Sequence, residues 1–339
     1  MKAPVVLVLL AWLLAVQTPV KAQDPHFTQF FASPLTLNPA FTGLFDGDLR
    51  VAGNYRNQWS SIATPFVTGT VSADFGILKK VIPYNDIWGV GILALYDQTG
   101  GGGLVTDYFA LSTAYHKGLD MEGRQTLAVG GQVAFVQKKL DFSKLLFENQ
   151  LTNQGFDPTL PSGEYFTNSN ISYPDYNVGL LYNGTIGDDN NIYLGASYYH
   201  ITQPNESFLG QPNQLHSRYT LHAGGAFAMS KTTRFYTSGL FMQQGGAQEI
   251  DAGGAFGLLV NSVPQSPTTF YIGAWYRWND AISPYVGMEF GSFQAGLSYD
   301  VNVSTLKPAS NYRGGMELSL IYIYQHSEFN TKKFNCPKF

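Results

Sequence analysis

Apolar side chains alternate with small or polar ones along most of the chain after residue 47. In residues 124–139, for example, Leu127, Val129 and Phe135 share one parity, and small or polar residues hold the other. Successive side chains of a strand point to opposite faces, so the pattern predicts strands with one apolar face and one tolerant face. Repeated around a closed antiparallel sheet, it predicts a β-barrel with lipid outside and small side chains or water inside.

The alternation predicts about 14 strands, most of them long enough to cross a bilayer when tilted. They cover residues 48–59, 64–76, 86–97, 104–118, 124–139, 173–184, 191–202, 217–230, 232–243, 248–259, 268–278, 281–290, 293–301 and 313–325. We therefore expect an all-β fold, in which residues 48–325 form an outer-membrane antiparallel β-barrel.

The lengths of the connections support this prediction. If both ends of the barrel domain face the periplasm, the long connections 140–172, 203–216 and 302–312 all lie on the outer side. Outer-membrane barrels have long outer loops and short inner turns. A soluble β-sandwich has no reason to sort its loops in this way.

Composition agrees with a lipid-facing sheet. Charged residues make up 13% of the chain, about half of the usual share of roughly 25%. Tyr, Phe and Gly number 21, 24 and 36, and aromatic rings near strand ends are typical of membrane girdles. The net charge of −4, without a basic cluster, argues against nucleic acid as a partner.

The first 22 residues have the pattern of a signal peptide. Lys2 precedes an apolar run over residues 3–16, which is too short to span a bilayer, and cleavage is expected between Ala22 and Gln23. No later apolar run approaches the roughly 18 to 20 residues of a membrane helix. The mature protein is therefore expected to leave the cytoplasm and to cross the membrane only with strands.

Residues 23–47, which we name the leader, do not follow the strand pattern. Three prolines exclude a regular helix or a central strand. The leader is nevertheless rich in apolar side chains, which a disordered tail would not carry. We expect it to pack in the lumen or on the periplasmic mouth as a plug, or to dock a partner. The candidate partner-binding residues are Phe27, Phe30, Phe31 and Phe41.

The inward parity of residues 217–230 is small and nearly uncharged, which predicts a narrow, neutral or plugged lumen. Signals for catalysis are weak. Asp97, His200 and His216 lie near outward loops and could seed a surface hydrolase, but solvated rim residues are the simpler interpretation. We predict no catalytic, cofactor-binding or metal site, and the single Cys336 excludes an internal disulfide or a thiolate cluster.

Several segments together resemble one known family. They are Gln23-Asp24-Pro25, Phe27-Thr28-Gln29, Asn38–Gly43, Tyr55–Trp59, Leu140–Leu145, Ser298–Asp300, Ala309–Asn311, Gly314–Ser319 and Cys336–Phe339. The chain resembles the PorP/SprF family of type IX secretion system membrane proteins over essentially all of its mature length. The leader and the Tyr-Arg-Asn-Gln-Trp element are the specific part of the resemblance.

The resemblance implies an outer-membrane β-barrel of Bacteroidota-type bacteria that aids the export or the surface anchoring of secreted proteins and gliding adhesins. The implied partners are the C-terminal domain of a secreted protein or adhesin, periplasmic components of the secretion system, and outer-membrane lipid. The resemblance implies no catalytic residue, and it does not decide between a role in export and a role in anchoring.

Binding is then expected at both ends of the barrel. The loop at 140–172, with Phe142 and Leu145, is the expected contact for the secreted domain. The leader and a periplasmic tail at 326–339, ending in Phe339, are expected to face periplasmic partners. The main alternative is an outer-membrane channel for small or apolar solutes.

Overall fold

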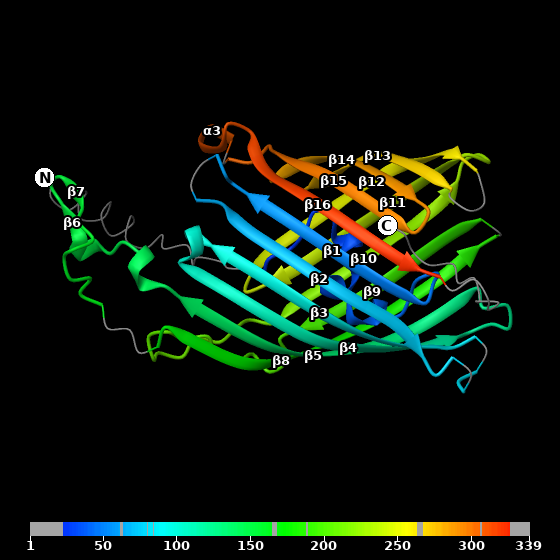
Figure 1. The fold of residues 1–339 in the computed structure, drawn as a ribbon, viewed down its shortest axis with the longest axis horizontal. Coiled ribbons are helices and arrows are strands. Elements are labelled where there is room, and N and C mark those ends of the chain that lie inside the picture. The colour runs from blue at the N-terminus through cyan, green and yellow to red at the C-terminus, as the bar shows by residue number, and fades with distance from the viewer. Residues whose placement is uncertain are drawn as a thin grey trace, which may run out of the picture.

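The computed structural model describes residues 23–61, 64–79, 81–83, 85–164, 168–187, 189–262, 267–305 and 307–325. Within these residues, fourteen antiparallel strands close into a single barrel (Figure 1). The predicted signal peptide with Ala22 and the predicted tail with Phe339 lie outside the described residues. No helix in the described part of the chain has the length and apolar character of a membrane span.

Consecutive strands are neighbours around the barrel, and the first pairs with the last, with Leu49 opposite Tyr324. The barrel strands are β1 (Leu49–Gln58), β2 (Phe66–Ile77), β3 (Ile87–Thr99), β4 (Leu104–Gly118), β5 (Gln125–Leu140), β8 (Asn170–Ile186), β9 (Asn190–Tyr199), β10 (Arg218–Ala228), β11 (Thr233–Gln244), β12 (Ala247–Asn261), β13 (Thr268–Arg277), β14 (Ala281–Phe290), β15 (Phe293–Asn302) and β16 (Arg313–Tyr324).

The prediction of an all-β barrel of about 14 strands is confirmed. Two strand ends differ by three residues, for local reasons. Strand β8 begins at Asn170 rather than 173, because Asn170 still pairs with Lys139 of β5. Strand β9 ends at Tyr199 rather than 202, because His200 has a φ of 58°, which takes the chain out of the extended conformation.

The alternating pattern separates the two faces of the wall. On β5, the side chains of Leu127, Val129 and Phe135 are about half exposed on the outer surface, whereas Ala128 and Ala134 are buried inside. Exposed apolar side chains recur on the outward parity of the other strands. An outer surface of this kind is stable only against lipid, because water would penalise so much exposed apolar area.

The two ends of the barrel differ. One end, which we name the loop mouth, carries the connections 59–65, 141–169, 200–217 and 303–312. The 141–169 connection extends far beyond the strands and contains η4 (Phe142–Lys144), η5 (Glu148–Gln150) and a small hairpin of β6 (Leu151–Thr152) and β7 (Gly155–Phe156) (Figure 1). The opposite end, the turn mouth, carries short connections such as residues 291–292 between β14 and β15.

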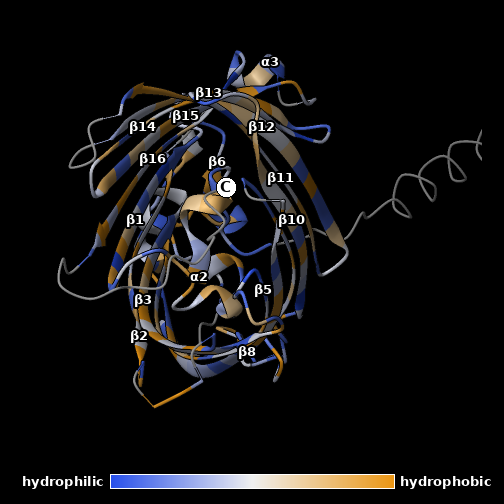
Figure 2. Cartoon of the chain, turned by 90° about the vertical axis from the view of Figure 1, so that its right-hand side faces the viewer, coloured by the Kyte–Doolittle hydropathy of each residue, from blue (hydrophilic) through white to orange (hydrophobic). Residues whose placement is uncertain are grey.

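The leader lies inside the barrel. It forms three short helical turns, η1 (Phe30–Ala32), α2 (Pro34–Leu37) and η2 (Pro39–Phe41). A view along the barrel shows these turns surrounded by the ring of strands (Figure 2). The leader runs from the loop mouth, where Asp24 contacts the last residue of β11, to the turn mouth, where Asp48, the residue after the leader, donates its backbone N–H to Tyr324. The protein's apolar core is therefore the packing of the leader against the inner wall.

Candidate functional site

The middle of the leader is fixed to the wall through Asn38, which is completely buried. Its side-chain amide donates to the backbone oxygens of Leu180, at 2.9 Å, and Ala196, at 3.2 Å. Its side-chain oxygen accepts from Ala40 N at 2.8 Å, which starts the turn of η2. Asn38 thus forms hydrogen bonds with both the leader backbone and the backbone of the wall strands.

Where Asn38 and Ala40 approach the wall, the facing wall residues are glycines, which allow close contact with the leader. A Cβ on Gly130 would lie 2.4 Å from the backbone nitrogen of Ala40. Beside it, a Cβ on Gly179 would lie 1.8 Å from the side-chain oxygen of Asn38. The small inward residues of these strands therefore form the seat of the leader. In this part of the lumen, the leader backbone fills the space that larger side chains of the wall would occupy.

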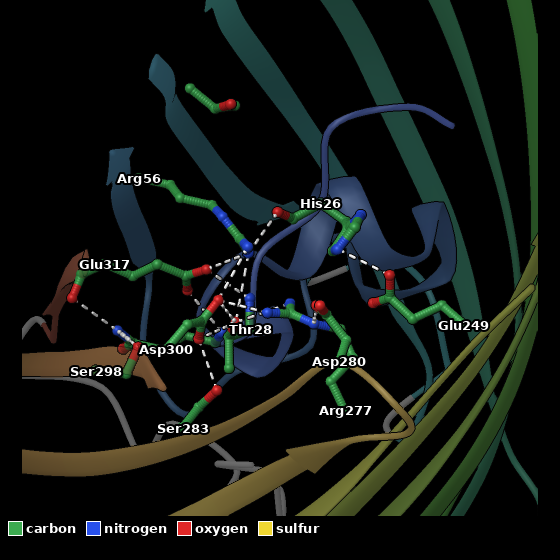
Figure 3. Close-up of polar contacts among 12 residues, drawn as sticks. His26, Thr28, Arg56, Glu249, Arg277, Asp280, Ser283, Ser298, Asp300 and Glu317 are labelled. Carbon is green, nitrogen blue, oxygen red and sulfur yellow. Dashed lines mark hydrogen bonds and ion pairs between the residues drawn. The ribbon is translucent and has the colours of Figure 1, made fainter. Parts of the chain in front are cut away.

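Nearer the loop mouth, Glu317 of β16 holds the leader backbone (Figure 3). Its two carboxylate oxygens accept the backbone N–H groups of Thr28, at 2.7 Å, and Gln29, at 2.9 Å. The Gln29 side chain in turn donates to Ser298 at 3.0 Å and accepts from Ser319 at 2.7 Å. The leader is thus bound across β15 and β16.

Two arginines neutralise the buried acids of this cluster. Arg56 contacts Glu317 at 2.6 Å and Asp300 at 3.0 Å, and Arg277 also pairs with Asp300 (Figure 3). Asp300 further accepts from Ser283 at 2.6 Å. All four charged side chains are buried. Buried charges of this kind are tolerated only when they are paired and hydrogen-bonded, as they are here.

A second clamp holds the other end of the leader, near the turn mouth. Arg50 and Asp74 form a bidentate pair with contacts of 2.9 Å and 2.7 Å. Asp74 also accepts the backbone N–H of Gly43 at 2.7 Å, and Arg50 donates to the backbone oxygen of Phe41 at 3.1 Å. Gly43 has a φ of +80°, which favours glycine at this reversal.

The tip of the leader is bound at the loop mouth by three side chains of the wall. The Asp24 carboxylate contacts His200 at 2.6 Å, Arg218 at 3.1 Å and Gln244 at 3.0 Å. Gln244 also accepts the backbone N–H of Asp24 at 2.8 Å. Asp175, fully buried, holds the other ring nitrogen of His200 at 3.0 Å.

The protonation states of His200 and Asp24 favour this arrangement. Burial of the His200 ring lowers its pKa, but the carboxylates of Asp24 and Asp175 outweigh burial and raise the pKa of His200 to about 9. Burial likewise raises the pKa of Asp24, but His200 and Arg218 outweigh it and hold that pKa well below its usual range. At neutral pH, His200 is therefore a cation between two carboxylates.

A cavity of about 720 Å³ opens above the leader at the loop mouth. Its floor is leader residues 23–26, and its wall combines charged groups with an apolar sector. That sector includes Leu93, Tyr108, Val136 and Leu215. The cavity has the volume of a ligand pocket and the mixed lining that such pockets carry.

Of the narrow, neutral or plugged lumen that the sequence left open, the neutral alternative is wrong for the lining as a whole. Beyond Arg218, the inner row of β10 is neutral where it packs against the leader; the ring centroids of Phe41 and His222 lie 5.2 Å apart. Further lumen charges lie on other strands, such as Arg56 on β1 and Glu317 on β16. One strand therefore does not represent the whole lining.

The predicted partner-binding residues fall into two groups. Phe27, Phe30 and Phe41 are buried in the lumen, and the ring of Phe31 packs 4.8 Å from that of Trp275. Phe142 and Leu145 are half-buried at the base of the 141–169 loop. Their role in partner binding stays a prediction, as does that of Phe339. Among the described residues of this loop, the exposed large apolar side chains, which the sequence analysis did not single out, are Leu146, Leu151, Phe156 and Leu160.

The residues considered for a surface hydrolase are engaged in other contacts. The Asp97 carboxylate accepts from Thr68 at 2.6 Å, and both ring nitrogens of His200 contact carboxylates, whereas His216 is held through its backbone oxygen, which accepts from Gln244. Within the described ranges, no group of three or more His, Cys, Asp or Glu side chains is arranged to hold a metal ion.

A comparison with protein families identifies the chain. The family model described as "Type IX secretion system membrane protein PorP/SprF" matches residues 20–322. The chain belongs to the PorP/SprF family. No curated protein matches it in a sequence search.

Solved structures support the fold of this PorP/SprF protein. The Ralstonia pickettii toluene transporter TbuX matches with a TM-score of 0.54 and 11% identity, over 87% of this chain and 94% of that one. The Pseudomonas putida toluene transporter TodX matches with a TM-score of 0.52 and 11% identity, over 90% of this chain and 98% of that one. At this identity the likeness concerns the fold alone. The protein is an outer-membrane β-barrel.

Several of the segments on which the PorP/SprF resemblance rests take part in seating the leader. Asp24, Thr28 and Asn38 come from the leader, Arg56 from the Tyr-Arg-Asn-Gln-Trp element, and Glu317 from β16. Sequence reasoning missed these residues as a site. The signal that could have found them is charge on the inward parity, because Arg56 shares its face with Ala52 and Asn54.

Proposed function

We propose that this PorP/SprF barrel is a non-enzymatic accessory of the type IX secretion system, which aids the export or surface anchoring of a secreted protein or adhesin. In this proposal the secreted chain binds at the loop mouth and does not pass through the lumen. The observation that carries the proposal is the leader, which occupies the lumen and is held by buried ion pairs at both ends.

The 141–169 loop supports binding of a protein domain. It projects beyond the strands (Figure 1) and exposes Leu146, Leu151 and Phe156, each about half accessible. Apolar side chains on a projecting loop are typical of a protein-binding surface, because exposure of apolar area to water is unfavourable unless a partner covers it. The C-terminal domain of a secreted protein is the partner that the family suggests.

The turn mouth offers a second surface, suited to periplasmic components of the system. The 78–86 and 119–124 turns are joined by Asn85, whose amide donates to the backbone oxygens of Asp120 and Met121. Val81 and Met121 are 77% and 93% exposed on these turns. Two turns that are joined by hydrogen bonds and carry exposed apolar side chains offer a surface on which a protein can dock.

The first test is deletion of the outward loop. Because Lys139 pairs with Asn170, residues 143–167 can be replaced by a short Gly-Ser linker without disturbing β5 or β8. We expect normal heat-modifiable gel migration, which reports barrel closure, and at least about a tenfold loss of the secreted partner at the cell surface. Surface labelling followed by quantitative mass spectrometry measures the loss.

Point variants give a matched control for this deletion. Phe156→Asp places a charge on the exposed apolar tip, whereas Asn153→Asp adds the same charge at an exposed polar position of the same hairpin. Display should fall with the first variant and not with the second. Unchanged display after the deletion and after Phe156→Asp would remove this loop from the mechanism.

A second candidate function is a channel or receptor for small apolar solutes. It is favoured by the apolar sector of the loop-mouth cavity and by the fold shared with proteins described as toluene transporters. Saturable binding of toluene to the purified barrel, together with normal display after loop deletion, would favour this candidate over the first.

A further inference from the structure

The tip of the leader is bound in the manner of a ligand. The Asp24 carboxylate accepts from three separate side chains, and Gln244 recognises the backbone of the same residue. Arg218 is itself oriented by its stacking on Tyr199, with the guanidinium carbon 4.0 Å from the ring centre. His200, Arg218 and Gln244 are thus held in place by the wall and meet at one carboxylate.

The charges of this group require an anion. His200 and Arg218 carry two positive charges, which Asp24 and Asp175 balance. The side chains of His200 and Arg218 are 8% and 9% exposed, whereas that of Asp24 is 21% exposed at the cavity edge. Loss of Asp24 alone would leave Asp175 to balance both Arg218 and His200, so that either His200 gives up its proton or one buried positive charge lacks compensation, and both are costly. Exchange of Asp24 for another carboxylate avoids that cost.

The tip can leave without the rest of the leader. His26 pairs with Glu249 at 2.8 Å, and its backbone oxygen accepts from Arg56 at 3.1 Å. Thr28 is bound to Glu317 two residues later. These contacts anchor the leader from His26 onward, so release of residues 23–25 keeps the lumen filled.

Space for an incoming chain lies directly beside the tip. Residues 23–26 form part of the floor of the cavity of about 720 Å³. A peptide segment whose carboxylate replaced that of Asp24 could place its neighbouring residues against the apolar sector of Leu93, Val136 and Leu215. The cavity lies at the mouth from which the 141–169 loop projects.

We propose that His200, Arg218 and Gln244 form a carboxylate receptor at the loop mouth, with Asp24 as its resident and displaceable ligand. The incoming ligand is a carboxylate-bearing peptide segment of the secreted partner. The identity of that partner rests on the proposed function, whereas the receptor itself can be tested on the purified barrel alone.

The experiment empties the receptor and refills it in trans. The mature chain with Asp24→Asn is purified in detergent and titrated with a dye-labelled Gln-Asp-Pro peptide that carries no other carboxylate. Fluorescence anisotropy should show binding at least about tenfold tighter than to the unmodified chain. The reason is that the charge-assisted hydrogen bonds of His200, Arg218 and Gln244 are no longer taken up by the Asp24 carboxylate. A Gln-Asn-Pro peptide is the matched control and should not bind.

Further variants make the result decisive. A chain whose mature sequence begins at His26 empties the receptor without adding an amide, and should bind the Asp peptide as Asp24→Asn does. Adding Arg218→Gln to Asp24→Asn should abolish that binding. Heat-modifiable migration verifies that each barrel is closed.

The outcomes separate this proposal from the proposed function. If both emptied chains are folded and fail to distinguish the Asp peptide from the Asn peptide, the receptor proposal is overturned, whatever the display assay shows. If they distinguish the peptides while loop deletion leaves display unchanged, the receptor stands and the proposed function of the loop fails.

Discussion

At the scale of single residues, the lumen depends on charges that are matched across strands. Arg56 of β1 lies directly opposite Glu317 of β16, where the first and last strands meet. The same Glu317 accepts two backbone N–H groups of the leader. One ion pair therefore joins the closure of the barrel to the seating of the leader.

The pairing of His200 predicts a pH dependence for the leader tip. The pKa of His200 is about 9 in the folded protein and 6.5 in the free side chain. Because the folded value is raised, the stabilisation is complete below about pH 6.5 and is lost as the pH rises through 9. A shift of this size corresponds to roughly 3 kcal/mol.

A nitroxide label measures this effect. With Cys336→Ser and Gln23→Cys, the label reports the mobility of the tip by electron paramagnetic resonance. We expect the mobile fraction to rise between pH 6.5 and about 9.5, because His200 loses the proton through which it contacts the Asp24 carboxylate. His200→Gln should show no such step. An immobile spectrum throughout this range would contradict the assignment.

At the scale of elements, the leader and the wall fit each other by backbone approach. Strand β5 shows this most clearly, because its neighbouring glycines face opposite sides. A Cβ on Gly130 would lie 2.4 Å from Ala40 N and 2.6 Å from its Cα, whereas a Cβ on Gly131 would meet nothing within 4 Å. The two positions form a natural pair of test and control.

Gly130→Ala should displace the leader from its seat. Overpacking against backbone atoms that cannot turn away costs about 1–3 kcal/mol. We expect a lower temperature for the heat-induced gel shift and faster proteolysis within the leader. Gly131→Ala points to the outer surface and should change neither. Equal behaviour of the two variants would show that the leader does not rest on this part of β5.

The sequence predicts the strands far better than it predicts the contents of the barrel. The alternation of Leu127, Val129 and Phe135 reports a local property, the side on which each residue faces the lipid. Pairings such as Arg56 with Asp300 join residues 244 positions apart and leave no local pattern. For Phe27, the sequence predicts packing in the lumen or at the periplasmic mouth, or contact with a partner, and does not decide between them. These contacts require the register of the closed sheet.

At the scale of the whole molecule, the barrel is built around its own N-terminal segment. A barrel of fourteen strands is wide enough to leave an aqueous channel when its inner side chains are small. Here the small side chains of the wall adjoin the leader instead, and the charged ones bind it. The molecule is thus a closed platform with a cavity at its loop mouth.

Removal of the leader should turn this platform into a pore. In a chain lacking residues 24–43, the wall glycines and the buried charges of β1, β12, β13, β15 and β16 would face an open lumen. Water would then fill the space and ions could cross it. In planar bilayers we expect stable single-channel steps from the deleted protein and none, or steps at least about tenfold smaller, from the full chain.

The heat-modifiable fraction must be isolated before this comparison, because the deletion also removes the contacts of Thr28 and Gln29 to Glu317 beside the β1–β16 junction. A full chain carrying Gly131→Ala controls for handling. If the closed, leader-deleted barrel conducts no better than the full chain, the wall itself or another segment seals the lumen. The leader would then be a brace for the barrel and not its plug.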